Sequence, residues 1–230
     1  VVPWWPINNA PQLWHHASAM AALCHTLAHE APLGVRELKT ELFRQWRKIV
    51  NTLELYPNGD SPFGVRDGLF MDHGLLMLMK TFPKEDSAKL YRKWLTLRER
   101  WYRAIIKPGQ RNTWMDFDHQ ELHLPWLPVL FAIAKENQSK YLQHMALSLM
   151  SESRNQQDPW LYQSMAWHDS KLGEDIDHHS KFEFFPQSGW ALGHENRRLH
   201  GAFFSFLCGA PGGKPHFDAW TQGRNDLSFE

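Results

Sequence analysis

Net charge and long apolar runs are both missing from this sequence of 230 residues. Lysine plus arginine and aspartate plus glutamate each number 25, so no overall electrostatic field would attract the chain to nucleic acid or to an anionic membrane. The longest apolar stretch, 122–134, is interrupted by Pro125 and Pro128 and is too short to cross a bilayer. We therefore expect no nucleic-acid partner and no membrane span.

Cysteine and several sequence motifs are also scarce or absent. The two cysteines, Cys24 and Cys208, would form one disulfide or remain reduced, and their apolar surroundings favour buried free thiols. The sequence has no Gly-rich phosphate loop, nucleophile elbow or zinc-finger spacing. These absences disfavour nucleotide-driven and serine-hydrolase chemistry.

Apolar residues instead recur at helical spacing along most of the chain. Residues 35–53 carry one apolar stripe, and residues 90–105 carry another that includes Arg98. Turn residues at 57–62 precede a Leu- and Met-rich helix expected over 69–82. Further helices are expected over 11–30, over 125–136, from a cap at Ser139 to 150, from Pro159 at a first helical position, and over 190–207.

The predicted fold is all-α, with roughly eight helices joined by short loops in a single helical domain covering residues 1–230. Consecutive helices would pack as antiparallel helical hairpins, and an incomplete (α/α) toroid is one arrangement of such hairpins. No strand pair, fixed-period repeat or interdomain linker is expected. The start at Val1, without an initiator Met or signal-like segment, indicates a processed chain or an excised domain, and no pattern identifies a cellular compartment.

Tryptophan and histidine are abundant, with 12 and 14 residues. One interpretation is that Trp fills a large helical core while His lies at its rim. The other is a cleft lined by aromatic rings and imidazoles, as in many sugar and metal sites. Abundance alone favours the first interpretation.

The N-terminal segment contains the first candidate site. Asn9 precedes a predicted helix, where its side chain would cap the helix or hold a ligand carboxylate through its amide. Trp5, Trp14 and His15 would complete a wall for a sugar ring. The alternative is that Asn9 is only a cap and the tryptophans are a hydrophobic anchor.

Residues 56–74 contain the second candidate site, a turn dense in charged residues that leads into an apolar helix. Asp72 and His73 would form an oriented acid/base pair, and Arg66 would bind an anionic group. The alternative is solvated turn chemistry in which Asp67 caps the next helix.

The order of these motifs resembles that of helical-toroid polysaccharide lyases and related glycan-processing enzymes. The similarity covers about the first 80 residues and rests on Asn8-Asn9, Pro57-Asn58-Gly59, Arg66 and the run from Asp67 to His73. It implies a helical toroid in which His73 acts as acid or base while Arg66 and Asn9 orient a uronate. The chain departs from the family in lacking a Tyr beside His73 and in being too short for a complete toroid of six hairpins.

Metal binding is a third possibility. His25 with His29 and His119 with His123 are four residues apart, which would place each pair on one helical face. Additional ligands would come from Asp169, Asp175, Asp177, His178 and His179. With 14 histidines such pairs also arise by chance, so we expect no metal or other cofactor, with zinc as the alternative.

Arg197 and Arg198, flanked by histidines, form the fourth candidate site. They would bind a carboxylate-bearing sugar or a phosphate, or dock an acidic segment of a partner. The alternative is that they belong to the polar face of an amphipathic helix.

Three functions follow from these patterns. The first is binding or cleavage of an acidic oligosaccharide or polysaccharide in a Trp- and His-lined cleft. Its catalytic residues would be His73, Arg66, Asp72 and Asn9, and its substrate-binding residues Trp5, Trp14, His15, Arg197 and Arg198. The second is a helical protein–protein interaction module of a larger assembly, which a flat apolar patch without a cleft would favour. The third is a His/Asp-rich metallohydrolase.

Overall fold

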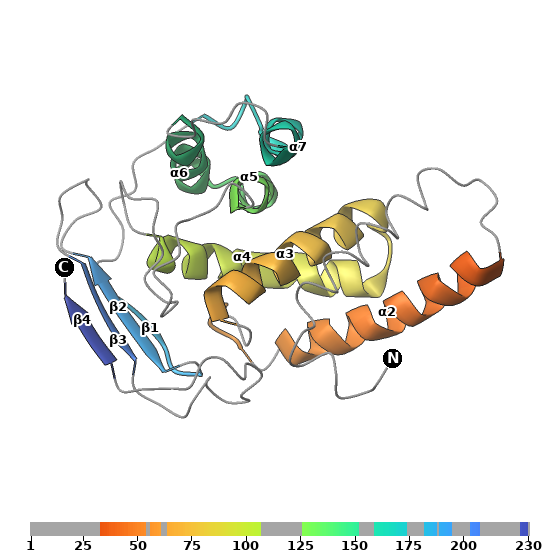
Figure 1. Cartoon of the computed structure of the whole chain (residues 1–230), viewed down its shortest axis with the longest axis horizontal. Helices are drawn as coiled ribbons and strands as arrows, with labels where there is room; N and C mark the ends of the chain where they lie inside the picture. The colour runs from red at the N-terminus through yellow and green to blue at the C-terminus, as the bar shows by residue number, and fades with distance from the viewer. Residues whose placement is uncertain are drawn as a thin grey trace.

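Helices come first and strands last in the computed structural model of this chain (Figure 1). The structure describes residues 33–53, 56–60, 64–106, 126–151, 159–173, 182–187, 189–194, 203–207 and 226–229. The helices are α2 (Leu33–Leu53), α3 (Gly64–Thr81), α4 (Asp86–Ile105), α5 (Trp126–Asn137), α6 (Lys140–Ser151) and α7 (Pro159–Trp167). The strands are β1 (Phe182–Phe185), β2 (Trp190–His194), β3 (Phe203–Leu207) and β4 (Asp226–Phe229). The prediction of a mainly helical fold is therefore confirmed.

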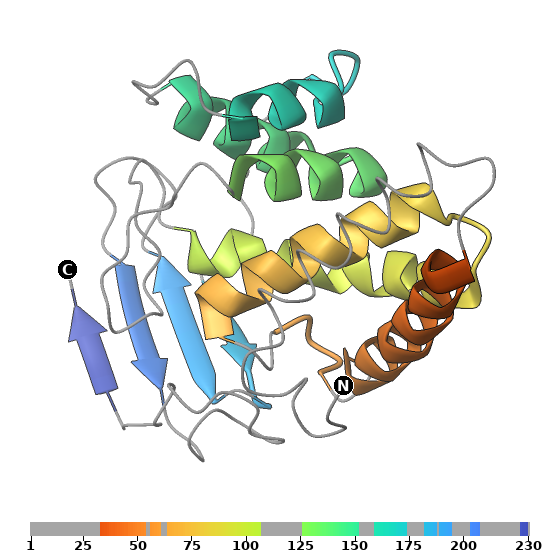
Figure 2. The same ribbon diagram turned by 45° about the vertical axis from the view of Figure 1, so that its right-hand side comes forward.

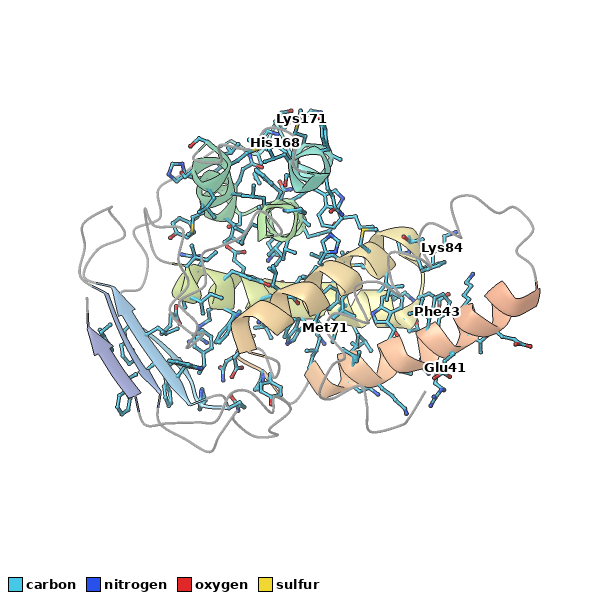
Figure 3. All side chains as sticks on the ribbon, in the orientation of Figure 1. Glu41, Phe43, Met71, Lys84, His168 and Lys171 are labelled. Carbon is cyan, nitrogen blue, oxygen red and sulfur yellow. The ribbon has the colours of Figure 1, made fainter. Side chains whose placement is uncertain are left out.

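The amphipathic pattern of α2 explains its position against the other helices. Its apolar stripe buries Trp46 and Val50, and α2 packs against α4. Figure 3 shows Phe43 on the side of α2 that faces the other helices and Glu41 on the opposite side. The ring of Phe43 meets that of Phe82, just after α3, edge to face with centroids 4.9 Å apart.

Helix α5 lies at the centre of the remaining helices. This helix packs against α3, α4, α6 and α7, which explains why it is apolar on nearly every side. Ser139 caps α6 as predicted, because its Oγ accepts a hydrogen bond from the backbone N–H of Leu142 at 3.3 Å. Helix α7 begins at Pro159, also as predicted.

The start of α3 differs from the prediction. The helix begins at Gly64 rather than near residue 69, so Asp67 is a helical residue and not the cap. Gly64 and Gly68 are poor helix formers, so local propensity alone does not favour a helix in this segment. Packing of α3 against α4 and α5 overrides that local preference.

The predicted helix over 190–207 is wrong, and so is the expectation that no strands pair. This region belongs to a four-stranded antiparallel sheet with strand order β1-β2-β3-β4. Burial alternates with the two-residue period of a strand: Phe185 and Leu192 are fully buried, whereas Phe184 is exposed. Gly189, with a φ of 76°, lies in the turn between β1 and β2, where a left-handed conformation favours glycine.

The sheet packs on the end of the helical part (Figure 2). The ring of Phe185 in β1 meets that of Trp101 in α4 with centroids 4.9 Å apart, and both residues belong to one continuous buried core. In the described part of the chain, no helix is long and apolar enough to span a membrane. The toroid and the single domain over the whole chain stay predictions.

Candidate functional site

Asp72 of α3 is the acceptor at the centre of a buried polar cluster. Arg98 of α4 donates to its Oδ2 from Nε at 2.9 Å and from Nη2 at 2.5 Å. Tyr102 donates to Oδ2 at 2.5 Å, and Tyr91 donates to Oδ1 at 3.0 Å. Asp72 and Arg98 are each only 1% exposed. The carboxylate therefore fixes α3 against α4 within the core.

The surroundings of Arg98 stabilise its charge. Its guanidinium carbon lies 4.8 Å from the ring centroid of Trp94 and 4.9 Å from that of Tyr102. Burial acts to lower the pKa of Arg98, but the Asp72 carboxylate and neighbouring tyrosines outweigh it and the pKa is raised. Burial and the Asp72 charge also raise the pKa of Tyr91 and Tyr102 well above the usual tyrosine range, so both phenols remain donors.

The turn at 56–60 is the first part of the second candidate site, and it connects this cluster to the rest of the fold. Arg98 Nη1 donates to the carbonyl oxygen of Gly59 at 2.6 Å. Gly59 has a φ of 82°, and a Cβ placed on it would lie 2.1 Å from the carbonyl oxygen of Leu97. Tyr56 and Asp60 are fully buried, and burial together with the Asp60 charge raises the pKa of Tyr56. The turn therefore packs into the core.

The same turn also contacts the sheet. Asn58 donates from Nδ2 to Gln187 Oε1 at 2.8 Å, just after β1. Arg100 of α4 donates from Nε to Glu183 Oε2 in β1 at 2.5 Å and from Nη1 to Asn58 Oδ1 at 3.4 Å. These bonds join α4, the turn and β1, so the polar residues of 56–60 support the fold.

His73 follows Asp72 in α3 but contacts α7. Its Nε2 lies 2.9 Å from Gln163 Oε1, and its ring stacks on that of Trp167 with centroids 5.7 Å apart. Burial lowers the pKa of His73, and the hydrogen bond to Gln163 offsets only part of this effect. Successive side chains of a helix do not face each other. The contacts of Asp72 and His73 with different helices therefore do not support the expected acid/base pair.

Most other predicted site residues lie outside the described part of the chain. Arg66 is a residue of α3, but its side chain is not described. The predicted residues outside the described ranges are Asn9, Trp5, Trp14, His15, Arg197 and Arg198.

The metal candidates are covered only in part. Among the residues that the structure describes, no three His, Cys, Asp or Glu side chains gather to hold a metal ion. Asp169 lies in a turn, where its Oδ1 accepts from the backbone N–H of Lys171 at 3.0 Å. The other candidates lie outside the described ranges: His25, His29, His119, His123, Asp175, Asp177, His178 and His179.

A surface that the sequence did not predict lies on the side of the sheet away from α4. The register places Phe184 beside Ala191 and Ala191 beside Phe206, and it aligns Phe182, Gly193 and Phe204 in the next row. Phe182 is 53% exposed, Phe184 50% and Phe206 36%, while Phe204 is half-buried. We call these four phenylalanines the aromatic face.

Gly193 allows the rings of this face to come together. A Cβ on Gly193 would lie 1.8 Å from the ring of Phe204, so that ring covers the glycine of the neighbouring strand. From there it reaches Phe182 of the next strand, with ring centroids 5.9 Å apart. The spacing of phenylalanines in Phe182-Glu183-Phe184 and Phe204-Ser205-Phe206 was the sequence signal for this face, once both segments are known to be strands.

Comparisons with known proteins assign this chain to no family. No protein-family model matches the chain, and no curated protein or solved structure matches it. Arguments about function therefore depend on the chain's own residues.

Proposed function

We propose that this chain is a protein-binding module whose contact surface is the aromatic face of the sheet. The observation that carries the proposal is the exposure of Phe182 and Phe184 on β1 and of Phe206 on β3, all on the same side of the sheet with β2 between them. Exposed aromatic side chains are enriched where proteins bind one another, because their desolvation supplies binding free energy.

The orientation of β1 supports this proposal. A sheet with one face on the core and one face in water usually places its polar side chains outward. In β1 the polar residue, Glu183, instead lies on the core side and pairs with Arg100, whereas Phe182 and Phe184 lie outward. This inverted pattern suits a strand whose outer face is covered by a partner.

A double variant of the aromatic face tests the proposal against a matched control. Phe184→Ser with Phe206→Ser removes two exposed rings, and Tyr162→Ser removes a ring that is 66% exposed on α7. Tagged proteins would be purified from native cells and their partners quantified by mass spectrometry. We expect one partner to lose about tenfold or more in recovery with the double variant, corresponding to hot-spot residues, and to be retained by Y162S. Equal recovery with both variants would contradict the proposal.

Binding or cleavage of an acidic glycan is the second candidate function. It is favoured by the grouping of an imidazole, an amide and an indole at His73, Gln163 and Trp167, which are side-chain types common in sugar sites. Titration with a panel of acidic oligosaccharides would be followed by tryptophan fluorescence in the wild type and in Trp167→Phe. Saturable quenching that is lost in W167F supports this function, and an unchanged spectrum with every oligosaccharide refutes it.

A further inference from the structure

We infer that the partner element bound by the aromatic face is a single amphipathic helix, an inference that rests on the protein-binding function proposed above. Four properties favour this occupant: the size of the face, its chemistry, the backbone hydrogen bonding of its strands and the packing on the opposite side of the sheet.

The size of the face excludes a stable dimer built on it alone. Neighbouring strands lie about 4.8 Å apart, and alternate residues of one strand about 7 Å apart. The whole outward side of the four-stranded sheet is three strand spacings wide and about five residues long. It therefore measures about 14 Å by about 17 Å, or on the order of 240 Å². A stable dimer buries about 800 Å² per partner. The apolar stripe of one helix, whose diameter is about 10 Å, fits this area.

The chemistry of the face selects an apolar ligand. Its described outward positions across the first three strands are phenylalanine, alanine or glycine: Phe182, Phe184, Ala191, Gly193, Phe204 and Phe206. None of these side chains has a charge or a hydrogen-bonding group for a phosphate or a sugar hydroxyl. Recognition by these side chains is therefore through apolar contact.

Backbone hydrogen bonding distinguishes a helix from an extended segment. Pairing of β2 with β1 and β3 directs its backbone N–H and C=O groups within the plane of the sheet. An extended segment lying across the face would leave its own backbone groups without partners there, which costs free energy. A helix satisfies these groups internally, so it packs on a sheet face without that penalty.

The opposite side of the sheet provides an internal comparison. There the C-terminal part of α4 contacts the sheet, with Trp101 against Phe185 at 4.9 Å between ring centroids and Leu192 fully buried. A partner helix on the aromatic face would place the sheet between the end of α4 and a second helix.

Site-specific photocrosslinking tests this inference. Benzoylphenylalanine would replace Phe184 or Phe206 in the full chain, and Tyr162 on α7 as the control. The crosslinked residues of the partner would be identified by mass spectrometry after irradiation in native cells. We expect one partner to be crosslinked from both sheet positions and not from position 162, at residues spaced by three or four.

The possible outcomes separate the two proposals. Crosslinked residues spaced by two, as on a strand, or crosslinks to a second copy of this chain would overturn the helical partner while leaving binding at the aromatic face intact. No crosslinking from positions 184 and 206 above that from position 162 would overturn the protein-binding function itself.

Discussion

At the scale of single residues, the core depends on Asp72 remaining ionised beside Arg98. Asp72→Asn removes the negative charge but keeps the side-chain shape, which leaves the Arg98 cation buried without its counter-charge. We expect the free energy of unfolding to fall by about 3–5 kcal/mol, measured by urea denaturation. Asp86→Asn, which removes an exposed partner of Lys89, is the control and should cause no measurable change. Comparable effects of both substitutions would show that the buried pair has no special importance.

Gly59 and Gly173 offer a matched test of backbone strain. Both have positive φ values, 82° and 71°, but a Cβ would collide with Leu97 at Gly59 and meet nothing within 4 Å at Gly173. We expect Gly59→Ala to destabilise the fold by about 2 kcal/mol or more and Gly173→Ala by about 1 kcal/mol. Thermal unfolding monitored by circular dichroism would measure both. Equal shifts in Tm would exclude the collision at Gly59.

His73 should make stability depend on pH. The unfolded chain binds a proton at the ordinary histidine pKa of 6.5, whereas burial lowers the pKa of His73 in the folded protein. The free energy of unfolding should therefore fall as the pH drops below 6.5 and level off below the folded pKa. His73→Gln removes this contribution, so urea denaturation at pH 7.5 and 5.5 should give a smaller difference in the variant. An equal difference in the two proteins would refute the assignment to His73.

The sequence predicts which side chains lie on the buried face of a helix, but it does not predict which side chains they contact on other helices. The helical spacing placed Arg98 on an apolar face, and the structure shows it buried there. Its counter-ion, Asp72, is 26 residues away in the chain and was instead paired with its neighbour, His73. Contacts between helices depend on how the helices pack, which spacing within one helix does not specify.

At the scale of elements, the length of each apolar repeat determined whether its secondary structure was predicted correctly. The long stripes of α2 and α4 extend over several turns and were predicted correctly. Strands β2 and β3 have only five residues each, and short apolar runs such as Phe203–Leu207 do not distinguish a strand from a buried helix. The turn at Gly189 and the burial of alternate residues became clear only from the pairing of the strands.

Packing between β2 and β3 is tested by a double-mutant cycle. Gly193→Ala places a methyl group where the Phe204 ring lies, so the ring must move and we expect a loss of about 1–2 kcal/mol. The same substitution in a Phe204→Ala background should cost less, because the ring is absent. Urea denaturation of the four proteins measures the coupling free energy. Additive effects would mean that the ring does not cover Gly193.

At the scale of the whole molecule, the two faces of the sheet have different environments. One face joins the helical part through Phe185 and through the bond between Arg100 and Glu183. The other presents the aromatic face, on which the proposed function and the helical partner both depend. The central claim is therefore that the adjacent residues Phe184 and Phe185 lie on opposite sides of β1.

Fluorine NMR would test that claim most directly. 4-Fluorophenylalanine would be placed singly at position 184 or 185 and titrated with a soluble paramagnetic agent. Phe184 is 50% exposed and Phe185 is fully buried, so we expect strong broadening of the signal at 184 and little at 185. Equal broadening at the two positions, or stronger broadening at 185, would contradict the exposed aromatic face and the binding function proposed for it.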